Sequence, residues 1–294
     1  MDMMRVKASA TSANLGAGFD VLGICLEEPY DIISVEKANE LSICVSGRGS
    51  EDIPLDPEKN TAGIVAREMG KNVRITIDSR IRPGSGLGSS AAPAAGTAVA
   101  INELFSMGYS KEELVWIAAR GEVAAAGAVH ADNVAPCILG GLTIVCNNYV
   151  EGVPMPDMGI VAILPDIIVS TRKAREILPE TVPLKEMVMN VGRASILMAG
   201  VMKKNPSIIG KAMNDSFNEK YRSPLIHGYE DVKKAALGSG AYGVAISGSG
   251  PTMLALCPPN LTSAIADAMR TKFTLHGVAC ESYITRVGPG VQKI

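Results

Sequence analysis

A glycine-rich segment that leads straight into an alanine-rich one most constrains what this chain can fold into. Three of its residues are glycines within a stretch of five, and glycine gives the backbone access to conformations that other residues avoid and brings N–H groups close to a ligand. The alanine-rich stretch predicts a helix, whose N-terminus attracts anions. The pattern therefore predicts a nucleotide phosphate loop formed by Pro83, Gly84, Ser85, Gly86, Leu87, Gly88, Ser89 and Ser90.

This loop differs from two common nucleotide motifs. The P-loop places a lysine before its hydroxyl residue, whereas Gly88 is followed directly by Ser89. The dinucleotide fingerprint needs a third glycine where Ala91 stands, and an acidic residue on a strand about twenty positions further on, and neither is found here. Hydride chemistry is therefore disfavoured. On these residues alone, a helix start capped by serine stays open.

Two further glycine-rich segments favour a binding function. Ser12–Asp20 reads Ser-Ala-Asn-Leu-Gly-Ala-Gly-Phe-Asp, and Gly243–Thr252 reads Gly-Val-Ala-Ile-Ser-Gly-Ser-Gly-Pro-Thr. Asn14 offers both a donor and an acceptor, and Asp20 offers a carboxylate suited to an ammonium group. Taken singly, the first segment is equally a polar turn and the second a tight connection between strands. Three such segments in one chain are harder to dismiss as ordinary turns.

The three motifs, in this order, resemble those of the kinases that phosphorylate galactose, homoserine, mevalonate and phosphomevalonate, the GHMP kinase family, over nearly the whole chain. A fourth segment, with Gly121-Glu122, His130–Pro136 and the pair Gly140-Gly141, is most similar to the homoserine kinases of that family. The resemblance implies ATP-dependent phosphorylation of the side-chain hydroxyl of L-homoserine, a step toward threonine.

The resemblance also implies the architecture. It predicts an α+β, two-domain GHMP kinase fold, with an N-terminal domain over residues 1–152 like domain 2 of ribosomal protein S5. The C-terminal domain, over residues 153–294, has elements predicted in the order β, α-rich, β, β, α, β, which resembles the ferredoxin-like C-terminal domain of this family.

Length and charge agree with an enzyme that acts on a small molecule. The chain of 294 residues has room for one large or two medium domains. A formal net charge of −2 argues against a nucleic-acid surface or a polybasic membrane contact. The six cysteines are dispersed, with no metal-ligand spacing, and there is no run of eighteen apolar residues. We therefore expect reduced core thiols, a cytoplasmic location, and neither nucleic acid nor membrane as a partner.

Hydrophobic periodicity and turn residues predict the elements in detail. In the first half, strands are predicted at Arg5–Ala10, Ile24–Lys37, Leu41–Ser46, Val73–Asp78 and Leu142–Cys146, and helices at Thr61–Met69, started by Asp56-Pro57-Glu58, at Ser89–Phe105 and at Lys111–Ala126. A proline-containing loop, Asn147–Asp157, is taken as the domain boundary. Beyond it, strands are predicted at Ile160–Leu164, near Val244 and Met253 and at Val278–Arg286, and helices at Lys173–Leu178, Leu184–Met202, Pro206–Met213, Pro224–Ala236 and Leu261–Phe273.

Phosphoryl transfer needs charge neutralisation over the phosphates and an acceptor hydroxyl held in line. Ser90 is similar to the family's hydroxyl near Mg²⁺ and the phosphates, and Glu122 to its metal-binding carboxylate. The resemblance therefore implies ATP and Mg²⁺ as cofactors, with both residues as metal ligands. Without it, a helix-start serine for Ser90 and a solvated helix residue for Glu122 stay open as alternatives.

The substrate pocket follows from the chemistry of homoserine, a zwitterion with a terminal hydroxyl. Its carboxylate calls for a cation, and guanidinium suits paired bonding to a carboxylate. The resemblance assigns the carboxylate to Arg175 and Arg222, the ammonium to Asp20, the reacting hydroxyl to Asn14, further pocket contacts to His130, Asn133 and Thr171, and a weaker adenine contact to Asn60.

The position that carries the catalytic aspartate in mevalonate-type kinases is Asn133, and Asp132 precedes it. An amide cannot accept the proton as a base, a feature similar to homoserine kinases. We therefore expect transfer with no dedicated side-chain base, assisted by Ser90, Glu122, Asn133 and Arg222, with Asp132 as the rival base.

Two other functions stay open on the sequence. Archaeal shikimate kinases share the family motifs and bind a hydroxylated carboxylate, although they would not need Asp20 for an ammonium group. Some relatives of galactokinase are ligand-sensing regulators, against which Ser90 and Glu122 argue. Relatives are commonly dimers, so the resemblance admits a homodimer.

Overall fold

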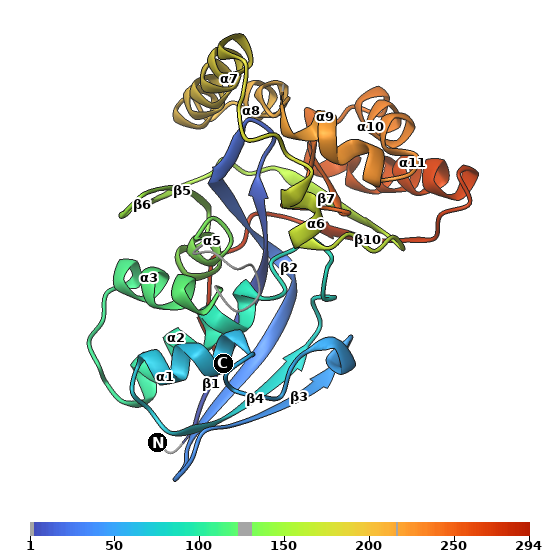
Figure 1. Ribbon diagram of the computed structural model, residues 1–294. Coiled ribbons are helices and arrows are strands. Elements are labelled where there is room, and N and C mark those ends of the chain that lie inside the picture. The colour runs from blue at the N-terminus through green and yellow to red at the C-terminus, as the bar shows by residue number, and fades with distance from the viewer. Residues whose placement is uncertain (1–2, 123–130, 216) are drawn as a thin grey trace.

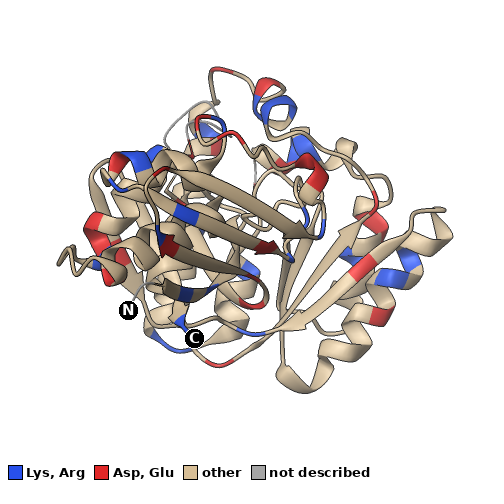
Figure 2. Ribbon diagram, turned by 90° about the horizontal axis from the view of Figure 1, so that it is seen from below, with Lys and Arg blue, Asp and Glu red and all other residues tan. Residues whose placement is uncertain are grey.

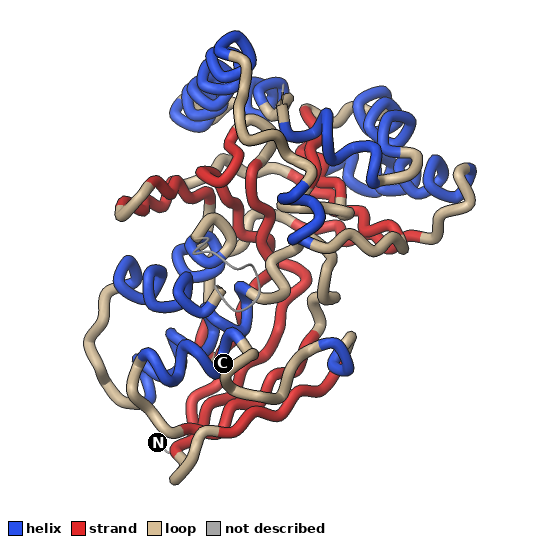
Figure 3. Tube along the Cα trace, in the orientation of Figure 1, coloured by secondary structure: helices blue, strands red, loops and turns tan. Residues whose placement is uncertain are grey.

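The computed structural model describes residues 3–122, 131–215 and 217–294. In Figure 1 a larger sheet with α1, α2 and α3 packed beside it forms the lower part, and a smaller sheet with α10 and α11 lies above it. The long strands β1 and β2 run from the lower part up to α7 and α8. Figure 3 shows the same division, with helices along one side of the strands in the lower part and above the strands in the upper part.

The larger sheet has the order β11-β1-β2-β4-β3, with β5 paired to β2 and β6 to β5. Among the strands that the structure describes in this sheet, only β3 and β4 pair in parallel, and the other pairs are antiparallel. Its strands are β1 (Met3–Asn14), β2 (Gly18–Lys37), β3 (Ser42–Gly47), β4 (Val73–Ser79), β5 (Leu142–Cys146), β6 (Tyr149–Val153) and β11 (Gln292–Lys293). The last strand brings the C-terminus back to the N-terminal strand, with Val6 opposite Lys293.

An alanine-rich helix covers one face of this sheet. In α2 (Ala91–Leu104) nearly every residue is buried, because the helix lies between the sheet and the helices α1 (Thr61–Glu68), α3 (Lys111–Gly121) and α5 (Val134–Leu139). Small side chains allow this close approach, and a Cβ on Gly96 would come within 2.6 Å of Ile33. The buried alanines, valines and isoleucines of these elements form one continuous core that reaches into the second sheet.

The smaller sheet is antiparallel, with the order β10-β7-β9-β8. It consists of β7 (Gly159–Pro165), β8 (Gly243–Ile246), β9 (Met253–Cys257) and β10 (Cys280–Thr285), with α10 (Tyr229–Gly238) and α11 (Thr262–Leu275) packed together against it. The order 4-1-3-2 with a helix after the first and third strands is the predicted ferredoxin-like arrangement. The insertion between β7 and α10 carries α6 (Thr171–Glu176), α7 (Leu184–Met202), α8 (Pro206–Ala212) and α9 (Asn218–Arg222). The two-domain α+β fold is confirmed, while the boundary at residue 152 stays a prediction.

Some predicted elements were wrong in detail. The loop predicted over Asn147–Asp157 contains β6, because Asn147 adopts a positive φ of 51° and closes a tight hairpin ahead of a valine-containing stretch. The helix predicted from Pro224 begins at Tyr229, because Gly228 adopts a left-handed conformation, with φ 87°, and ends the preceding turn.

Other elements had no sequence signal or began elsewhere. The short helices α5 and α9 and the strand β11 were not predicted. The Asp56-Pro57-Glu58 sequence forms a turn, and α1 begins later, at Thr61, capped by Asn60. The helix predicted over Lys111–Ala126 is described only to Gly121 and Glu122, and its last predicted residues lie outside the described part. Among the described residues, the structure contains no helix long and apolar enough to cross a membrane.

Candidate active site

The three glycine-rich segments meet in one place. The first is the tip of the β1–β2 hairpin, where Asn14, Leu15 and Gly16 all have positive φ after an irregularity in the strand pairing. The second leads from β4 into α2, and the third is the turn between β8 and β9. They line a shared cavity of about 220 Å³.

Backbone hydrogen bonds hold these segments together. The Gly248 N–H donates to the Ala13 carbonyl at 3.2 Å, and the Thr252 N–H donates to the Ser85 carbonyl at 3.2 Å. The Ser247 hydroxyl donates to the Gly86 carbonyl at 2.6 Å. These hydrogen bonds therefore join segments that are more than 150 residues apart in sequence along one side of the cavity.

The predicted phosphate loop depends on glycine in two different ways. Gly84, Gly86 and Gly88 have φ values of 69°, 78° and 72°, a region that other residues rarely adopt. At Gly86 a Cβ would lie 2.5 Å from the Ser247 carbonyl oxygen, whereas at Gly84 there is open space. The loop therefore needs glycine for conformation throughout and for space at Gly86 and at Gly88, where a Cβ would lie 2.2 Å from the Thr11 hydroxyl oxygen. The following serines turn into α2, with Ser90 at the N-cap position.

The Ser90 hydroxyl donates a hydrogen bond of 2.8 Å to Oε2 of Glu122, which immediately follows α3. Glu122 is buried, and its second oxygen, Oε1, has no hydrogen-bond partner among the described residues. Burial raises the pKa of Glu122 to about 7, partly offset by the Ser90 hydrogen bond. A buried carboxylate with an unused oxygen, beside a hydroxyl and a phosphate loop, fits the oxygen donors that Mg²⁺ prefers.

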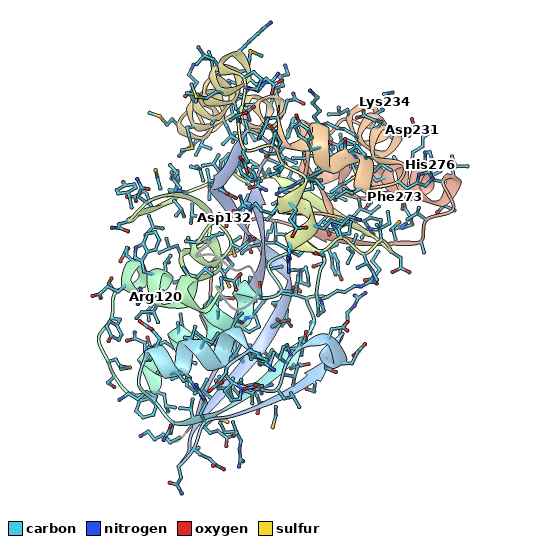
Figure 4. The ribbon with its side chains drawn as sticks, viewed as in Figure 1. Arg120, Asp132, Asp231, Lys234, Phe273 and His276 are labelled. Carbon is cyan, nitrogen blue, oxygen red and sulfur yellow. The ribbon has the colours of Figure 1, made fainter. Side chains whose placement is uncertain are left out.

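On the opposite side of the cavity, Arg175 of α6 donates a hydrogen bond of 2.7 Å to Oδ2 of Asp20, and both side chains are partly exposed. Asp132 is buried beside this pair, and Figure 4 labels it next to α5, between the two sheets. Burial raises the pKa of Asp132 to about 7, and the nearby negative charge of Asp20 adds to the increase. An ion pair and an extra acid therefore face the phosphate loop.

The Gly248 carbonyl accepts two side-chain hydrogen bonds. One comes from Nδ2 of Asn14 at 2.9 Å, and the other from Nη1 of Arg222 at 3.0 Å. Asn14 also accepts the Asp20 N–H at 3.0 Å, and Arg222 donates from Nε to the Ala174 carbonyl at 3.1 Å. Arg222 is only 5 % exposed, so these carbonyls solvate a nearly buried charge at the edge of the cavity.

Comparisons with known proteins agree with this geometry. Residues 59–141 match the model of the GHMP kinase N-terminal domain, and residues 197–275 match that of the GHMP kinase C-terminal domain. The chain is 73 % identical over 294 residues to a homoserine kinase of Methanocella arvoryzae, covering 100 % of this chain and 98 % of the relative. The chain belongs to the GHMP kinase family.

Two other relatives of this GHMP kinase extend the match. A homoserine kinase of Haloarcula marismortui is 50 % identical over 290 residues, with 99 % of each chain covered. The crystal structure of homoserine kinase from Cytophaga hutchinsonii superposes with a TM-score of 0.93 at 35 % identity, covering 100 % of this chain and 98 % of that one. Membership in this family implies that the protein uses ATP.

The remaining predicted site residues of the GHMP kinase have varied surroundings. Oδ1 of Asn133 accepts the Thr11 hydroxyl at 2.9 Å, and the Thr171 and Ser249 hydroxyls lie 3.3 Å apart at the cavity edge. His130 lies outside the described residues. Asn60 caps α1, accepting the Ala62 N–H at 2.9 Å and donating to the Pro54 carbonyl at 2.7 Å, so its adenine contact stays a prediction.

Sequence reasoning did not assign roles to several residues at the site. Ser249 and Gly248 belong to the third glycine-rich motif, which was noted but not assigned to the pocket. Glu219 of α9 carried no sequence signal, yet its buried carboxylate accepts from the Tyr229 hydroxyl at 2.6 Å, Lys233 at 2.7 Å and the Ile246 N–H at 2.8 Å. It fixes α9, and therefore Arg222, to the end of β8.

Proposed function

We propose that this protein transfers the γ-phosphate of ATP to the side-chain hydroxyl of L-homoserine, giving O-phospho-L-homoserine, with Mg²⁺ as the metal. One observation supports this most strongly: the phosphate loop and the Arg175–Asp20 ion pair line the same cavity. A phosphate site opposite a paired cation and anion suits an acceptor that is itself a zwitterion. The predicted homodimer and the predicted cytoplasmic location stay predictions.

On the phosphate side, the loop binds the triphosphate through backbone N–H groups and the N-terminus of α2. Ser90 and Glu122 would hold Mg²⁺, since their oxygens already lie together and one carboxylate oxygen is unpaired among the described residues. Bound there, the ion would neutralise charge on the phosphate oxygens. Glu122 must lose its proton to act as a ligand.

On the acceptor side, the Arg175–Asp20 pair would separate enough to take the two charges of the substrate. Arg175 and Arg222 would bind the carboxylate, and Asp20 the ammonium group. The exchange replaces one ion pair by two, so its cost is small for side chains that are 43 % and 36 % exposed. Asn14 lies at the hairpin tip beside Asp20, in reach of an acceptor hydroxyl.

The proton of the hydroxyl has two candidate routes. In the base-free route it passes to the transferred phosphate as the loose transition state forms. This is our preferred route, because Asn133 cannot act as a base and its oxygen accepts the Thr11 hydroxyl. Asp132, whose pKa is raised to about 7, is the rival. Loss of turnover in Asp132→Asn, with unchanged homoserine affinity and melting temperature, would exclude the base-free route.

The function is tested by a coupled assay of ADP release with purified protein, MgATP and four separate acceptors: L-homoserine, shikimate, mevalonate and galactose. We expect release with homoserine alone, and mass spectrometry should identify the phosphorylated product. Release with shikimate alone would replace the acceptor and leave the phosphate site. No ADP release with any of the four acceptors would favour a ligand sensor and refute the proposed function.

A further inference from the structure

One aromatic ring lies against both arginines of the proposed acceptor site. The guanidinium carbon of Arg175 lies 5.2 Å from the centroid of the Phe19 ring, and that of Arg222 lies 5.1 Å from it. Both distances fall within the range of cation–π contacts. The three residues come from β2, α6 and α9, so the contact joins the larger sheet to the insertion in the second domain.

The Phe19 ring lies where two positively charged side chains come close together. Arg175 and Arg222 carry the same charge, and Arg222 is almost completely buried. Burial lowers the pKa of Arg222, and the neighbouring Arg175 lowers it further. The negative face of an aromatic ring attracts a guanidinium without using any of its N–H donors. Phe19 therefore offsets part of the repulsion without occupying an N–H donor of either guanidinium.

The ring also has a defined place relative to the cavity. Arg222 lines the polar cavity, whereas Phe19 lines a separate, mostly apolar hollow of about 1090 Å³ under α7. Arg175 borders both. Phe19 therefore stands behind the arginines, on the side away from the phosphate loop. Asp20, the next residue, holds Arg175 from the cavity side at 2.7 Å.

We propose that Phe19 is a positioning residue that holds Arg175 and Arg222 as a preformed pair for the carboxylate of the acceptor, and that it thereby sets the preference for an acceptor with a carboxylate. This inference rests on the proposed function for the identity of the acceptor. The pairing of the ring with the two arginines stands on the contacts alone.

The test combines a change in the ring with a change in the substrate. Phe19→Leu keeps an apolar side chain and removes the π-face, whereas Phe19→Tyr keeps both. In Phe19→Leu we expect KM for homoserine to rise about 5- to 30-fold, with kcat and KM for ATP within twofold of wild type. In Phe19→Tyr we expect KM for homoserine to stay near the wild-type value. With 3-aminopropan-1-ol, which lacks the carboxylate, wild type and Phe19→Leu should have equal kcat/KM.

The matched control is Phe105→Leu. Phe105 also has two cations near its ring, Lys71 at 4.8 Å and Lys37 at 5.5 Å, but it follows the C-terminus of α2, the end away from Ser90. Its variant should leave KM for homoserine unchanged. An equal loss with both acceptors in Phe19→Leu, or an unchanged KM for homoserine, would overturn the positioning role.

A second measurement separates this inference from the proposed function. In protein labelled with ¹⁵N-arginine, the ring should displace the Hε signals of Arg175 and Arg222, and Phe19→Leu should remove both displacements. If wild type does not phosphorylate homoserine but the displacements are present, the proposed function and the carboxylate preference fail while the pairing holds. If the displacements are absent, the pairing itself is wrong.

Discussion

The two sides of the cavity are built in different ways. The phosphate side consists mainly of backbone, fixed by hydrogen bonds between three distant segments and by a glycine that has no room for a side chain. The acceptor side consists of long side chains, with an ion pair between Arg175 and Asp20 that is more than one third exposed. Under the proposed function, the nucleotide would meet a site fixed by the backbone before binding, and the acceptor would meet side chains that can exchange partners.

The charges outside the cavity show no such organisation. Figure 2 shows basic and acidic residues interspersed over the ribbons. The His276–Asp231 pair, with Nε2 and Oδ2 2.9 Å apart, lies at the outer end of α10 and α11, far from Asp132 in Figure 4. This pair gives a control for charge changes remote from the site.

The largest effect is expected at Glu122. Glu122→Gln keeps the shape and removes the negative charge that would bind Mg²⁺, so kcat should fall about 10²- to 10³-fold and the Mg²⁺ concentration for half-maximal rate should rise. Steady-state kinetics across a Mg²⁺ titration measures this. Asp231→Asn, the remote control, should leave both values unchanged. Wild-type Mg²⁺ dependence in Glu122→Gln would remove this residue from the metal site.

The rigidity of the phosphate side is tested within its own loop. Gly86→Ala places a Cβ against two carbonyl oxygens and adds strain at a positive φ, so unfolding should become easier by about 2–4 kcal/mol and KM for ATP should rise. Gly84→Ala has the same kind of φ but open space, so it should cost only about 1 kcal/mol. Urea unfolding and ATP kinetics compare them. Equal losses would mean that the contacts of Gly86 do not matter.

Substitutions on the acceptor side should weaken substrate binding and leave the stability of the fold nearly unchanged. Arg175→Met keeps much of the side-chain length and removes the charge, so KM for homoserine should rise about tenfold or more, while the melting temperature changes little because the ion pair is partly exposed. Arg270→Met is the control, because Arg270, whose side chain is 46 % exposed, forms a comparable ion pair with Asp267 on α11 and is not among the residues that line the cavity. A large loss of stability in Arg175→Met would show that this side is structurally fixed too.

The smallest effect is a dependence of stability on pH. Burial raises the pKa of Glu122 and of Asp132 to about 7, above the value near 4 expected in the unfolded chain. Between these values the folded state binds more protons, so both groups make stability fall as pH rises from about 4 to 7. The urea midpoints of wild type and Glu122→Gln should therefore diverge in favour of the variant across this window. Midpoints that run parallel would indicate an ordinary pKa for Glu122.

The phosphate loop could be predicted from the sequence because its requirements are local. Positive φ at alternate positions favours glycine there, so the spacing of Gly84, Gly86 and Gly88 ahead of a helix-forming stretch predicts the loop. The buried helix α2 was predicted for the same reason, since alanine favours helices and permits close packing. The antiparallel order of the smaller sheet followed from the resemblance to the family.

Other features could not be predicted because they depend on contacts between distant residues. Three such contacts join residues remote in sequence: the Glu219 carboxylate with the Ile246 N–H, Asn133 with Thr11, and β11 with β1. The role of Asn60 as a cap was missed because Asp56-Pro57 gave a stronger helix-start signal one turn earlier. The pairing of Asp20 with Arg175 joins two residues 155 positions apart.

The sequence by itself determined the glycine turns, most helices and strands and the types of residue at the site, because these depend on the conformational freedom and chemistry of neighbouring residues. Only the tertiary structure decided which charges face each other. Burial raised the pKa values of Glu122 and Asp132, and folding brought Phe19 against Arg175 and Arg222. The strength of a charge–charge interaction depends on the distance between the groups and on the exclusion of water, and both are set only when the chain has folded.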